Sequence, residues 1–284
     1  MLKLWVALVL LVSAVWAADP GLERARLLYE KADYAGSLRL LESLKERGAG
    51  VWNLLGRNQF MMEDYRKATE AFERATALEP GNSEHWLWLG RSYGRRAELA
   101  SVFLAPGYAS KTRQHLERAV ALDGRNIEAL NDLFEYYMQA PGFLGGGLEK
   151  AQGLVEKIGA VDPVERCWAN ARLAEERKDY RAAEAQLRRG MELAPRDAGR
   201  VVDLAKFLAR RGRGQESESV FEQARKLEPN SPVYLWERAN LLIEQKREPG
   251  EARRLLEQYL SVAVKPEDDH KSEARRLLGR LKGI

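Results

Sequence analysis

Apolar residues recur along most of this chain at the spacing of helices rather than at the alternating spacing of strands. The clearest stretch runs from residue 51 to residue 80, where they form two helical stripes: Trp52, Leu55 and Gly56 on the first, and Ala68, Phe72 and Ala75 on the second. Small residues allow two helices to approach closely, and large residues fill the space between them. Pro80 ends the second helix, because proline disfavours helical geometry in the preceding residue. A single pair of helices cannot bury its own apolar face, so we expect neighbouring pairs on both sides.

The spacing of these residues resembles the tetratricopeptide repeat, a helix–turn–helix unit of about 34 residues with W-x2-L-G near its start, followed by Ala, Phe and Pro. The resemblance implies an all-α fold, a right-handed α-solenoid in which each repeat contacts only its neighbours. It covers about residues 22–260 and is weaker at both ends.

Extending the pattern outward predicts about seven repeats within residues 18–266, near 18–48, 49–82, 83–126, 127–163, 164–197, 198–231 and 232–266. The first lacks the tryptophan and the glycine, which is common for a terminal repeat with one face in solvent. Residues 267–284 carry an apolar face opposite a basic face: Ala274, Leu277, Leu278 and Leu281 against Arg275, Arg276, Arg280 and Lys282. We predict that this segment is a helix that caps the core.

Two insertions distinguish the third and fourth repeats. They share an Ala-Pro-Gly-aromatic pattern, at residues 105–108 and 140–143. Both fall between a first and a second helix, so stacking of the repeats is expected to place them side by side on one edge. Two interpretations stay open: partner recognition from edge loops, or turns whose aromatic side chains cover exposed helix ends. The residues concerned are Pro106, Tyr108, Pro141 and Phe143. A short inserted helix over residues 97–104 is a further possibility.

Residues 1–17 have the pattern of a signal peptide: a positive start, an apolar core, and small residues before a cleavage point after Ala17. The alternative is an uncleaved anchor, but about 15 apolar residues fall short of the roughly 20 that span a bilayer. We therefore expect export to the periplasm or the extracellular space. No membrane span is expected after cleavage.

Charge and candidate chemistry favour binding over catalysis. Lys and Arg number 46 against 42 Asp and Glu, a net charge of +4, and no nucleic-acid motif accompanies it. His85, His115 and His270 are far apart along a linear array. The single cysteine, Cys167, falls on an apolar stripe, which favours a buried hydrophobe over a nucleophile. Gly145–Gly147 lacks the Lys-Ser/Thr of a phosphate-binding loop. We predict no catalytic residue, metal or cofactor.

The resemblance implies that the first helices line a concave groove that receives a peptide, a helix or a folded protein. Its groove positions correspond here to Asn53, Arg57, Phe60, Leu87, Trp88, Arg91, Asn131, Glu135, Met138, Trp168, Arg172, Trp236 and Asn240. Since Trp86 takes the core position, Trp88 cannot fully share that face. Two interpretations stay open for Trp88, Trp168 and Trp236: exposure in the groove, which we expect for at least one of them, or packing against the next repeat.

These patterns predict a non-catalytic scaffold for protein–protein interaction in the cell envelope. The clamp by which some family members grip a carboxylate is missing, because its positions hold Asn53, Arg57, Trp88 and Glu128. The alternative function is an accessory or regulatory subunit of a secreted or envelope enzyme, acting through the edge loops. The sequence leaves the partner and the oligomeric state open.

Overall fold

The computed structural model describes residues 20–265 and 270–281, and within these ranges it is helical without any strand. The elements are α1 Pro20–Glu30, α2 Tyr34–Ser43, α3 Ala49–Met61, α4 Tyr65–Leu78, α5 Ser83–Leu99, α6 Ala105–Leu122, α7 Ile127–Gln139, η1 Gly142–Leu144, α8 Leu148–Val161, α9 Pro163–Glu176, α10 Tyr180–Leu193, α11 Ala198–Arg210, α12 Gly214–Leu227, α13 Pro232–Glu244, α14 Pro249–Ser261 and α15 Lys271–Leu281. The predicted signal peptide lies outside the described residues.

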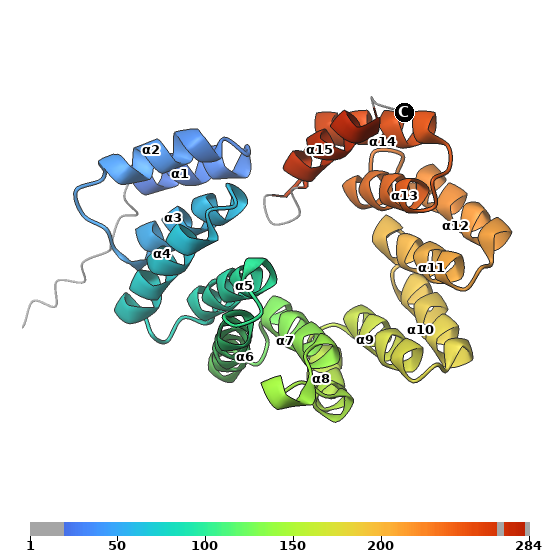
Figure 1. Ribbon diagram of the computed structural model, residues 1–284, viewed down its shortest axis with the longest axis horizontal. Helices are drawn as coiled ribbons and strands as arrows, with labels where there is room; N and C mark the ends of the chain where they lie inside the picture. The colour runs from blue at the N-terminus through green and yellow to red at the C-terminus, as the bar shows by residue number, and fades with distance from the viewer. Residues whose placement is uncertain (1–19, 266–269, 282–284) are drawn as a thin grey trace, which may run out of the picture.

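Successive helices pack as antiparallel pairs, and the pairs stack into a curved array (Figure 1). Helices α1 and α2 form one end of the arc, and α14 and α15 form the other. The first helix of each pair from α3 to α13 lines the inside of the arc, and the second helix lies outside. The predicted α-solenoid of helix–turn–helix repeats is confirmed.

Two local signals define the regular repeats. Asp or Asn side chains accept a backbone N–H at the start of many helices: Asp33, Asp64, Asn82, Asn126, Asp162, Asp179 and Asp197. A residue with positive φ ends the first helix of each repeat that lacks an insertion: Ala32, Glu63, Lys178, Gly212 and Lys246. This left-handed residue reverses the chain within a short turn. The turn therefore has the same geometry even where its residue is not glycine.

Close helix packing explains the small residues of the repeat. A Cβ on Gly56 would lie 2.7 Å from the ring of Phe72, so the ring occupies the space that a side chain would need. Cys167 is buried in α9, as predicted for a hydrophobe, and burial raises the pKa of its thiol.

The first insertion lengthens helices instead of forming a loop. Helices α5 and α6 have 17 and 18 residues, against 13 and 14 in α3 and α4. Pro106 and Tyr108 lie in the first turns of α6, so their predicted placement in an edge loop is wrong. Proline suits this position because the first turn needs no N–H from it. The connection itself is residues 100–104, and the short helix considered over 97–104 is instead the end of α5 and a turn.

The second insertion does form an irregular edge. Pro141 precedes η1, and the chain then passes through Gly145 and Gly147, whose φ values of 89° and 144° favour glycine. Phe143 in η1 is 82% exposed, so it does not cover a helix end. Tyr108 does pack inward, because Arg96 lies over its ring and donates to its hydroxyl at 2.8 Å.

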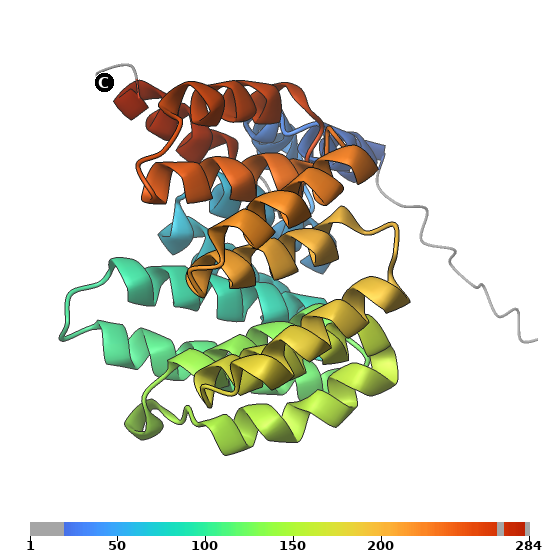
Figure 2. The ribbon, with the colours of Figure 1, turned by 90° about the vertical axis from the view of Figure 1, so that its right-hand side faces the viewer.

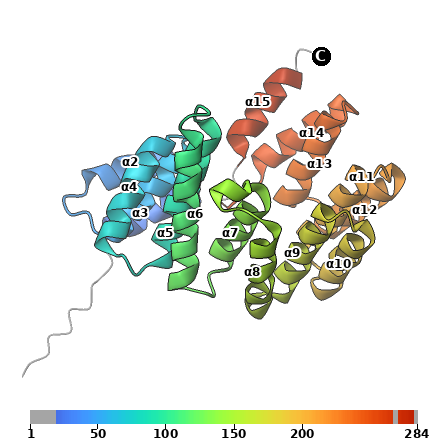
Figure 3. The same cartoon turned by 60° about the horizontal axis from the view of Figure 1, so that its bottom comes forward.

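Helix α15 packs against α14 at the end of the arc. Ala274, Leu277 and Leu281 are buried in the same cluster as Leu256. Arg253 of α14 donates to the backbone oxygen of Leu281 at 2.8 Å. Figure 3 shows α15 beside α14, and the basic residues Arg275, Arg276 and Arg280 of α15 are exposed. The last apolar face of the array is thus covered.

Candidate partner-binding site

The N-terminal part of the concave face is built around Trp88, which is only 3% exposed. Its ring stacks on Phe72 with centroids 5.9 Å apart and meets the edge of Phe60 at 5.4 Å. The guanidinium groups of Arg57 and Arg91 each lie 4.9 Å from the Trp88 ring centroid. Trp88 is therefore a core residue that supports two groove arginines, which favours packing over groove exposure, the two interpretations left open for it.

Trp86 is not the fully buried core residue that the repeat pattern predicts at its position. Trp86 is half-buried, stacks on His115 with centroids 5.5 Å apart, and donates to the backbone oxygen of Pro80 at 2.9 Å. The rings of Trp86 and Trp88 point to different sides of α5, as their spacing of two requires. Trp88 packs against Phe60 of α3 and Phe72 of α4, whereas Trp86 packs against His115 of α6, so the preceding repeat supplies the core around Trp88.

Arg57 links three successive repeats. It donates to the hydroxyl of Tyr29 in α1 at 3.4 Å and to Glu84 in α5 at 2.8 Å. Its guanidinium also lies 5.0 Å from the Tyr29 ring centroid, in addition to its contact with Trp88. A planar, permanently charged group is suited to stacking and bidentate contacts of this kind.

Arg91 repeats this arrangement one repeat further. It pairs with Glu128 at 2.9 Å and with Asp132 at 2.6 Å, both from α7. Burial would lower the pKa of Arg91, but the two carboxylates outweigh burial and raise its pKa above the usual value. Glu84 and Glu128 are the outer members of these pairs, with side chains 51% and 57% exposed.

The central concave face continues as a series of polar links between first helices. Asn131 of α7 donates to Glu165 of α9 at 3.2 Å, and Glu165 also pairs with Arg200 of α11 at 2.9 Å. Arg172 of α9 donates to Glu135 of α7 at 3.0 Å. Three predicted groove residues therefore lie on the concave side and link α7 to α9: Asn131, Glu135 and Arg172.

The links extend to the C-terminal repeats. Lys206 pairs with Glu237 at 2.7 Å, and Arg210 pairs with Glu175 at 2.8 Å. Asp203 lies among these groups, 3.2 Å from Arg200. Burial raises the pKa of Asp203 to about 6, with Glu165 and Glu237 adding to the rise, although Arg200 and Lys206 oppose it. This carboxyl therefore changes its charge near neutral pH.

The remaining predicted groove residues fall into three environments. Asn53 and Leu87 are buried. Phe60, Met138, Trp168 and Asn240 are half-buried, and Trp168 contacts Phe134 at 5.6 Å between centroids. Trp236 stacks on His270 with centroids 4.7 Å apart and planes 12° apart.

The chain's own C-terminal connection covers the last part of the groove. Val262 and Val264, which follow α14, pack with Trp236 against the C-terminal core. Lys265 then lines two separate cavities, one beside α13 and one beside α5 and α7. Trp236 is thus paired within the molecule, and the open part of the concave face is its N-terminal half.

That open part contains a polar cavity of about 650 Å³. Its walls come from the N-terminal ends of α5 and α7, from Arg57 and from Lys265 of the C-terminal connection. The lining residues are Arg57, Gly81, Asn82, Ser83, Glu84, Leu87, Trp88, Asp123, Asn126, Glu128 and Lys265. A second cavity of about 490 Å³ lies between α5, α6, α7 and the turn before η1, where Ala97, Pro141 and Leu144 contribute apolar walls. Both lie near the inserted repeats.

The sequence interpretation missed a buried histidine contact. His85 Nδ1 lies 3.0 Å from the amide nitrogen of Asn53, and His85 Nε2 lies 3.2 Å from Glu79. Since the amide nitrogen of Asn53 donates a hydrogen bond, Nδ1 accepts it. Nε2 therefore carries the hydrogen and donates a hydrogen bond to the Glu79 carboxylate. It also missed the polar links. Arg200 and Arg210 follow their acidic partners Glu165 and Glu175 by 35 residues, about one repeat, so a search for opposite charges one repeat apart would find them.

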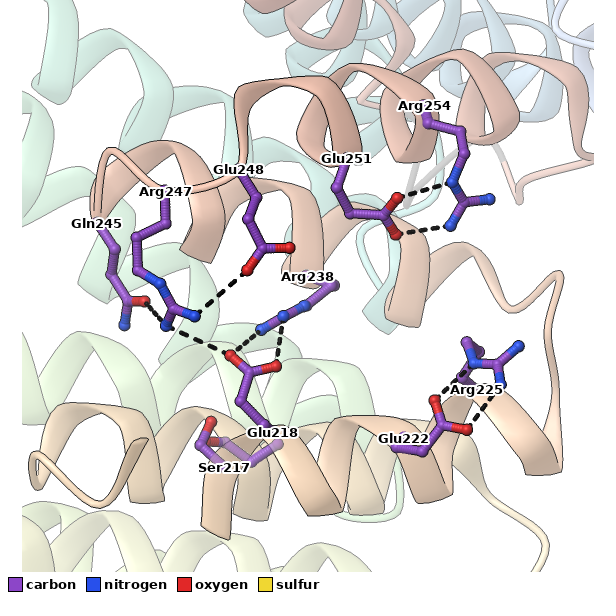
Figure 4. A network of polar contacts seen from close by, with 11 residues as sticks. Ser217, Glu218, Glu222, Arg225, Arg238, Gln245, Arg247, Glu248, Glu251 and Arg254 are labelled. Carbon is purple, nitrogen blue, oxygen red and sulfur yellow. Dashed lines mark hydrogen bonds and ion pairs between the residues drawn. The ribbon is translucent and has the colours of Figure 1, made fainter. Parts of the chain in front are cut away.

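A second polar network joins the second helices to the following repeat (Figure 4). Glu218 of α12 accepts from Arg238 of α13 at 3.0 Å and from Arg247 at 3.4 Å. Tyr93 and Tyr137 contact Glu73 and Glu117 across the same 20-residue separation as Arg238 and Glu218. Burial, together with those carboxylates, raises the pKa of both tyrosines above the usual value.

In residues 20–265 and 270–281, His, Cys, Asp and Glu side chains form no group that could hold a metal ion. Within the same ranges, no helix combines the length and the apolar character needed to cross a bilayer.

Known proteins match the chain in part by sequence and more widely by fold. Residues 49–82 match the sequence model of the tetratricopeptide repeat family. No curated protein sequence matches the chain. A tetratricopeptide repeat protein from Parabacteroides merdae shares 16% identity and a TM-score of 0.60, over 92% of this chain and 97% of that one.

Two further solved structures are similar. A thermophilic tetratricopeptide repeat protein from Thermus thermophilus shares 22% identity and a TM-score of 0.55, over 66% of this chain and 97% of that one. The Cut9–Hcn1 hetero-tetramer of the APC/C contains a chain with 15% identity and a TM-score of 0.55, over 94% of this chain and 49% of that one. The chain thus carries a tetratricopeptide repeat at residues 49–82, within an α-solenoid whose fold it shares with these proteins.

Proposed function

We propose that the chain is a non-catalytic scaffold that binds a peptide or protein partner in the N-terminal half of its concave face. The observation that carries the proposal is the 650 Å³ cavity, whose outer rim is formed by the half-exposed carboxylates of Glu84 and Glu128. Their arginine partners, Arg57 and Arg91, are held from behind by Trp88. The carboxylates are thus held in place before any partner arrives, which reduces the entropy cost of binding.

This arrangement favours a partner that donates hydrogen bonds or carries positive charge. Each carboxylate uses one face for its arginine and keeps free acceptor capacity toward solvent. Asn126 and Asn82 at the adjacent helix starts add polar contacts at the cavity wall. We expect a basic or polar segment to lie across the ends of α5 and α7.

Affinity capture with matched variants tests this proposal. The full chain is used to capture cross-linked partners from a cell-envelope fraction, beside a Glu84→Gln, Glu128→Gln variant and a Glu222→Gln control on the outer side of the array. We expect recovery of the main partner to fall roughly tenfold in the double variant, because two charge-assisted contacts are lost. The control should capture as much as the unchanged chain. Equal recovery by all three chains, with equal helical circular dichroism, would refute the groove proposal.

We also propose that the chain is exported, on the strength of the signal-peptide pattern in residues 1–17. Expression with the native N-terminus, followed by fractionation and mass spectrometry of the intact chain, tests this. We expect a chain that begins at Ala18 and is found outside the cytoplasm. A chain that keeps Met1 and stays in the membrane fraction would support the anchor instead, and a chain with Met1 in the cytosol would contradict export.

A further inference from the structure

The two insertions expose large apolar side chains to solvent. In the connection between α5 and α6, Val102 is 80% exposed and Phe103 is 90% exposed, with Leu99 and Leu104 also exposed beside them. Phe143 in η1 is 82% exposed. Large apolar side chains exposed together in this way commonly mark a contact with a partner or a membrane.

The two tips lie on the same side of the molecule. Figure 2 shows the connection between α5 and α6 and the segment around η1 both projecting to the left, beyond the bodies of their helices. Helix α6 contacts η1, so the position of one tip is fixed relative to the other. The repeats without insertions have only their short left-handed turns on that side.

Basic residues lie behind both tips, in excess over acidic residues behind the first tip and balanced by Glu149 behind the second. Residues 95–113 contain four basic residues and one acidic residue, a net charge of +3. Arg96 lies over the Tyr108 ring at 4.3 Å, and Lys111 donates to the Tyr93 hydroxyl at 3.1 Å. Both cations are thus oriented by tyrosines. Behind Phe143, Lys150 donates to the backbone oxygen of Gly145 at 2.8 Å and stays exposed.

We propose that this edge docks on an anionic membrane surface. Phe103, its apolar neighbours and Phe143 enter the boundary between headgroups and acyl chains, and Arg96, Lys111 and Lys150 face the lipid phosphates. The distances agree with this arrangement. Lys111 lies seven residues after Leu104 along one helix, which places it about 10 Å behind the tip. That is the depth, roughly 5–10 Å, to which interfacial apolar groups enter a bilayer.

A lipid surface fits these features better than a protein partner does. The tips are convex, and a protein would need a matching pocket for each of two projections held at a fixed distance. A fluid lipid interface accepts both without shape complementarity. The charge behind the tips is also that which anionic headgroups attract, at about 1 kcal/mol for each basic residue near the surface. The proposal does not depend on the groove at α5 and α7.

Fluorescence from single labelled sites tests the docking directly. In a full chain carrying Cys167→Ala, a nitrobenzoxadiazole label is placed through Val102→Cys, Gly142→Cys or, as a control, Gly214→Cys at the start of α12, directly after a regular turn. A Cβ at Gly142 or Gly214 meets no atom within 4 Å, so these substitutions fit the fold. The vesicles are two parts phosphatidylcholine to one part phosphatidylglycerol, or phosphatidylcholine alone.

With anionic vesicles, we expect blue-shifted emission and quenching by acyl-chain nitroxides at sites 102 and 142, and neither change at site 214. This comparison reports insertion of the tips even if residues 1–17 hold the whole chain at the membrane. The double variant Phe103→Ser, Phe143→Ser should bind the vesicles roughly tenfold more weakly, because apolar area is removed. The emission change at site 102, titrated with vesicles, measures this affinity. Lys111→Gln should weaken it less and reduce its dependence on salt.

Four results would overturn the proposal. Labels at 102 and 142 that stay as exposed as the label at 214 would show that the tips do not enter lipid. Equal quenching at all three sites would show contact without orientation. Self-association in size-exclusion chromatography that Phe103→Ser abolishes, without any lipid response at site 102, would assign the surface to a second copy of the chain. Capture of a protein through the tips, again without a lipid response, would assign it to a protein partner.

Discussion

The inserted repeats, residues 83–163, and the regular repeats that follow them are built from the same helical pairs but differ in their connections and in the contacts that link one repeat to the next. In the regular repeats, a single left-handed residue such as Lys178 or Lys246 turns the chain, and Arg–Glu pairs link one repeat to the next. In the inserted repeats, the turn is replaced by longer helices or by η1, and the links include a cluster of aromatic rings under arginines. Stacking thus depends on the helix faces, and the connection is free to change.

The largest expected effect comes from the aromatic cluster. Trp88→Ala should destabilise the fold by about 3–5 kcal/mol, because a fully buried ring leaves a cavity and two arginines lose their support. Trp168→Ala, at the corresponding place in the regular repeats, should cost roughly 1–2 kcal/mol because its ring is only half-buried. Urea unfolding followed by circular dichroism compares the two. Equal losses would mean that the cluster around Trp88 is no more important than the packing elsewhere.

The outer network offers a similar comparison within one helix. Glu218→Gln should destabilise the chain by roughly 1–3 kcal/mol, because it weakens the pairing of the buried guanidinium of Arg238. Glu222→Gln, four residues along α12, removes an exposed pair with Arg225 and should cost under about 1 kcal/mol. Thermal unfolding of the two variants provides the measurement. A larger loss in Glu222→Gln would contradict the role given to burial.

Asp203 should give the regular repeats a pH dependence. Its folded pKa, about 6, lies above the value of 3.8 for an unperturbed Asp, so the folded state binds a proton more tightly than the unfolded state does. Its contribution therefore makes the fold more stable as the pH falls from above 6 toward 4, by at most about 3 kcal/mol. Asp203→Asn should raise stability at pH above 6 and flatten this part of the profile. An unchanged profile in urea unfolding between these pH values would exclude this role.

The smallest expected effect concerns the regular turn. Lys178 has a φ of 61°, which costs a non-glycine residue roughly 1 kcal/mol, so Lys178→Gly should stabilise the fold by up to about 1 kcal/mol. Lys157→Gly, inside α8 of an inserted repeat, should destabilise it by about 1 kcal/mol, since glycine is a poor helix former. Differential scanning calorimetry of both variants measures the contrast. Destabilisation by Lys178→Gly would show that the left-handed residue is not under strain.

Sequence periodicity predicted the helical pairs well, because every repeat must bury one face at the same spacing. The resemblance to the tetratricopeptide repeat placed Arg57, Arg91 and Arg172 on the concave side, where their helices lie. The sequence pattern failed at Trp86, since Trp86 and Trp88 lie two positions apart and only the neighbouring helices decide which of them is in the core. It also failed at Pro106, where Ala-Pro-Gly reads as a turn but serves as the start of a helix.

The candidate site could be predicted only in outline. The positions facing the groove follow from the repeat, but the pairing of their charges depends on how far each repeat rotates relative to the last. The contact between Trp236 and the C-terminal connection joins two segments whose order in the chain carries no periodic signal. Exposure of Phe103 likewise depends on where α5 ends, which the apolar pattern did not indicate.

Lys265 lines cavities at α13 and at α5 and α7, which belong to distant parts of the arc. An array of stacked repeats bends and twists through small rotations that add up over the interfaces between repeats. The connection after α14 reaches across the arc to the third repeat, where Lys265 lines the same cavity as the start of α5. Opening the arc would move Lys265 away from the other walls of this cavity, so the shape of the cavity at α5 and α7 depends on a segment near the opposite end of the chain.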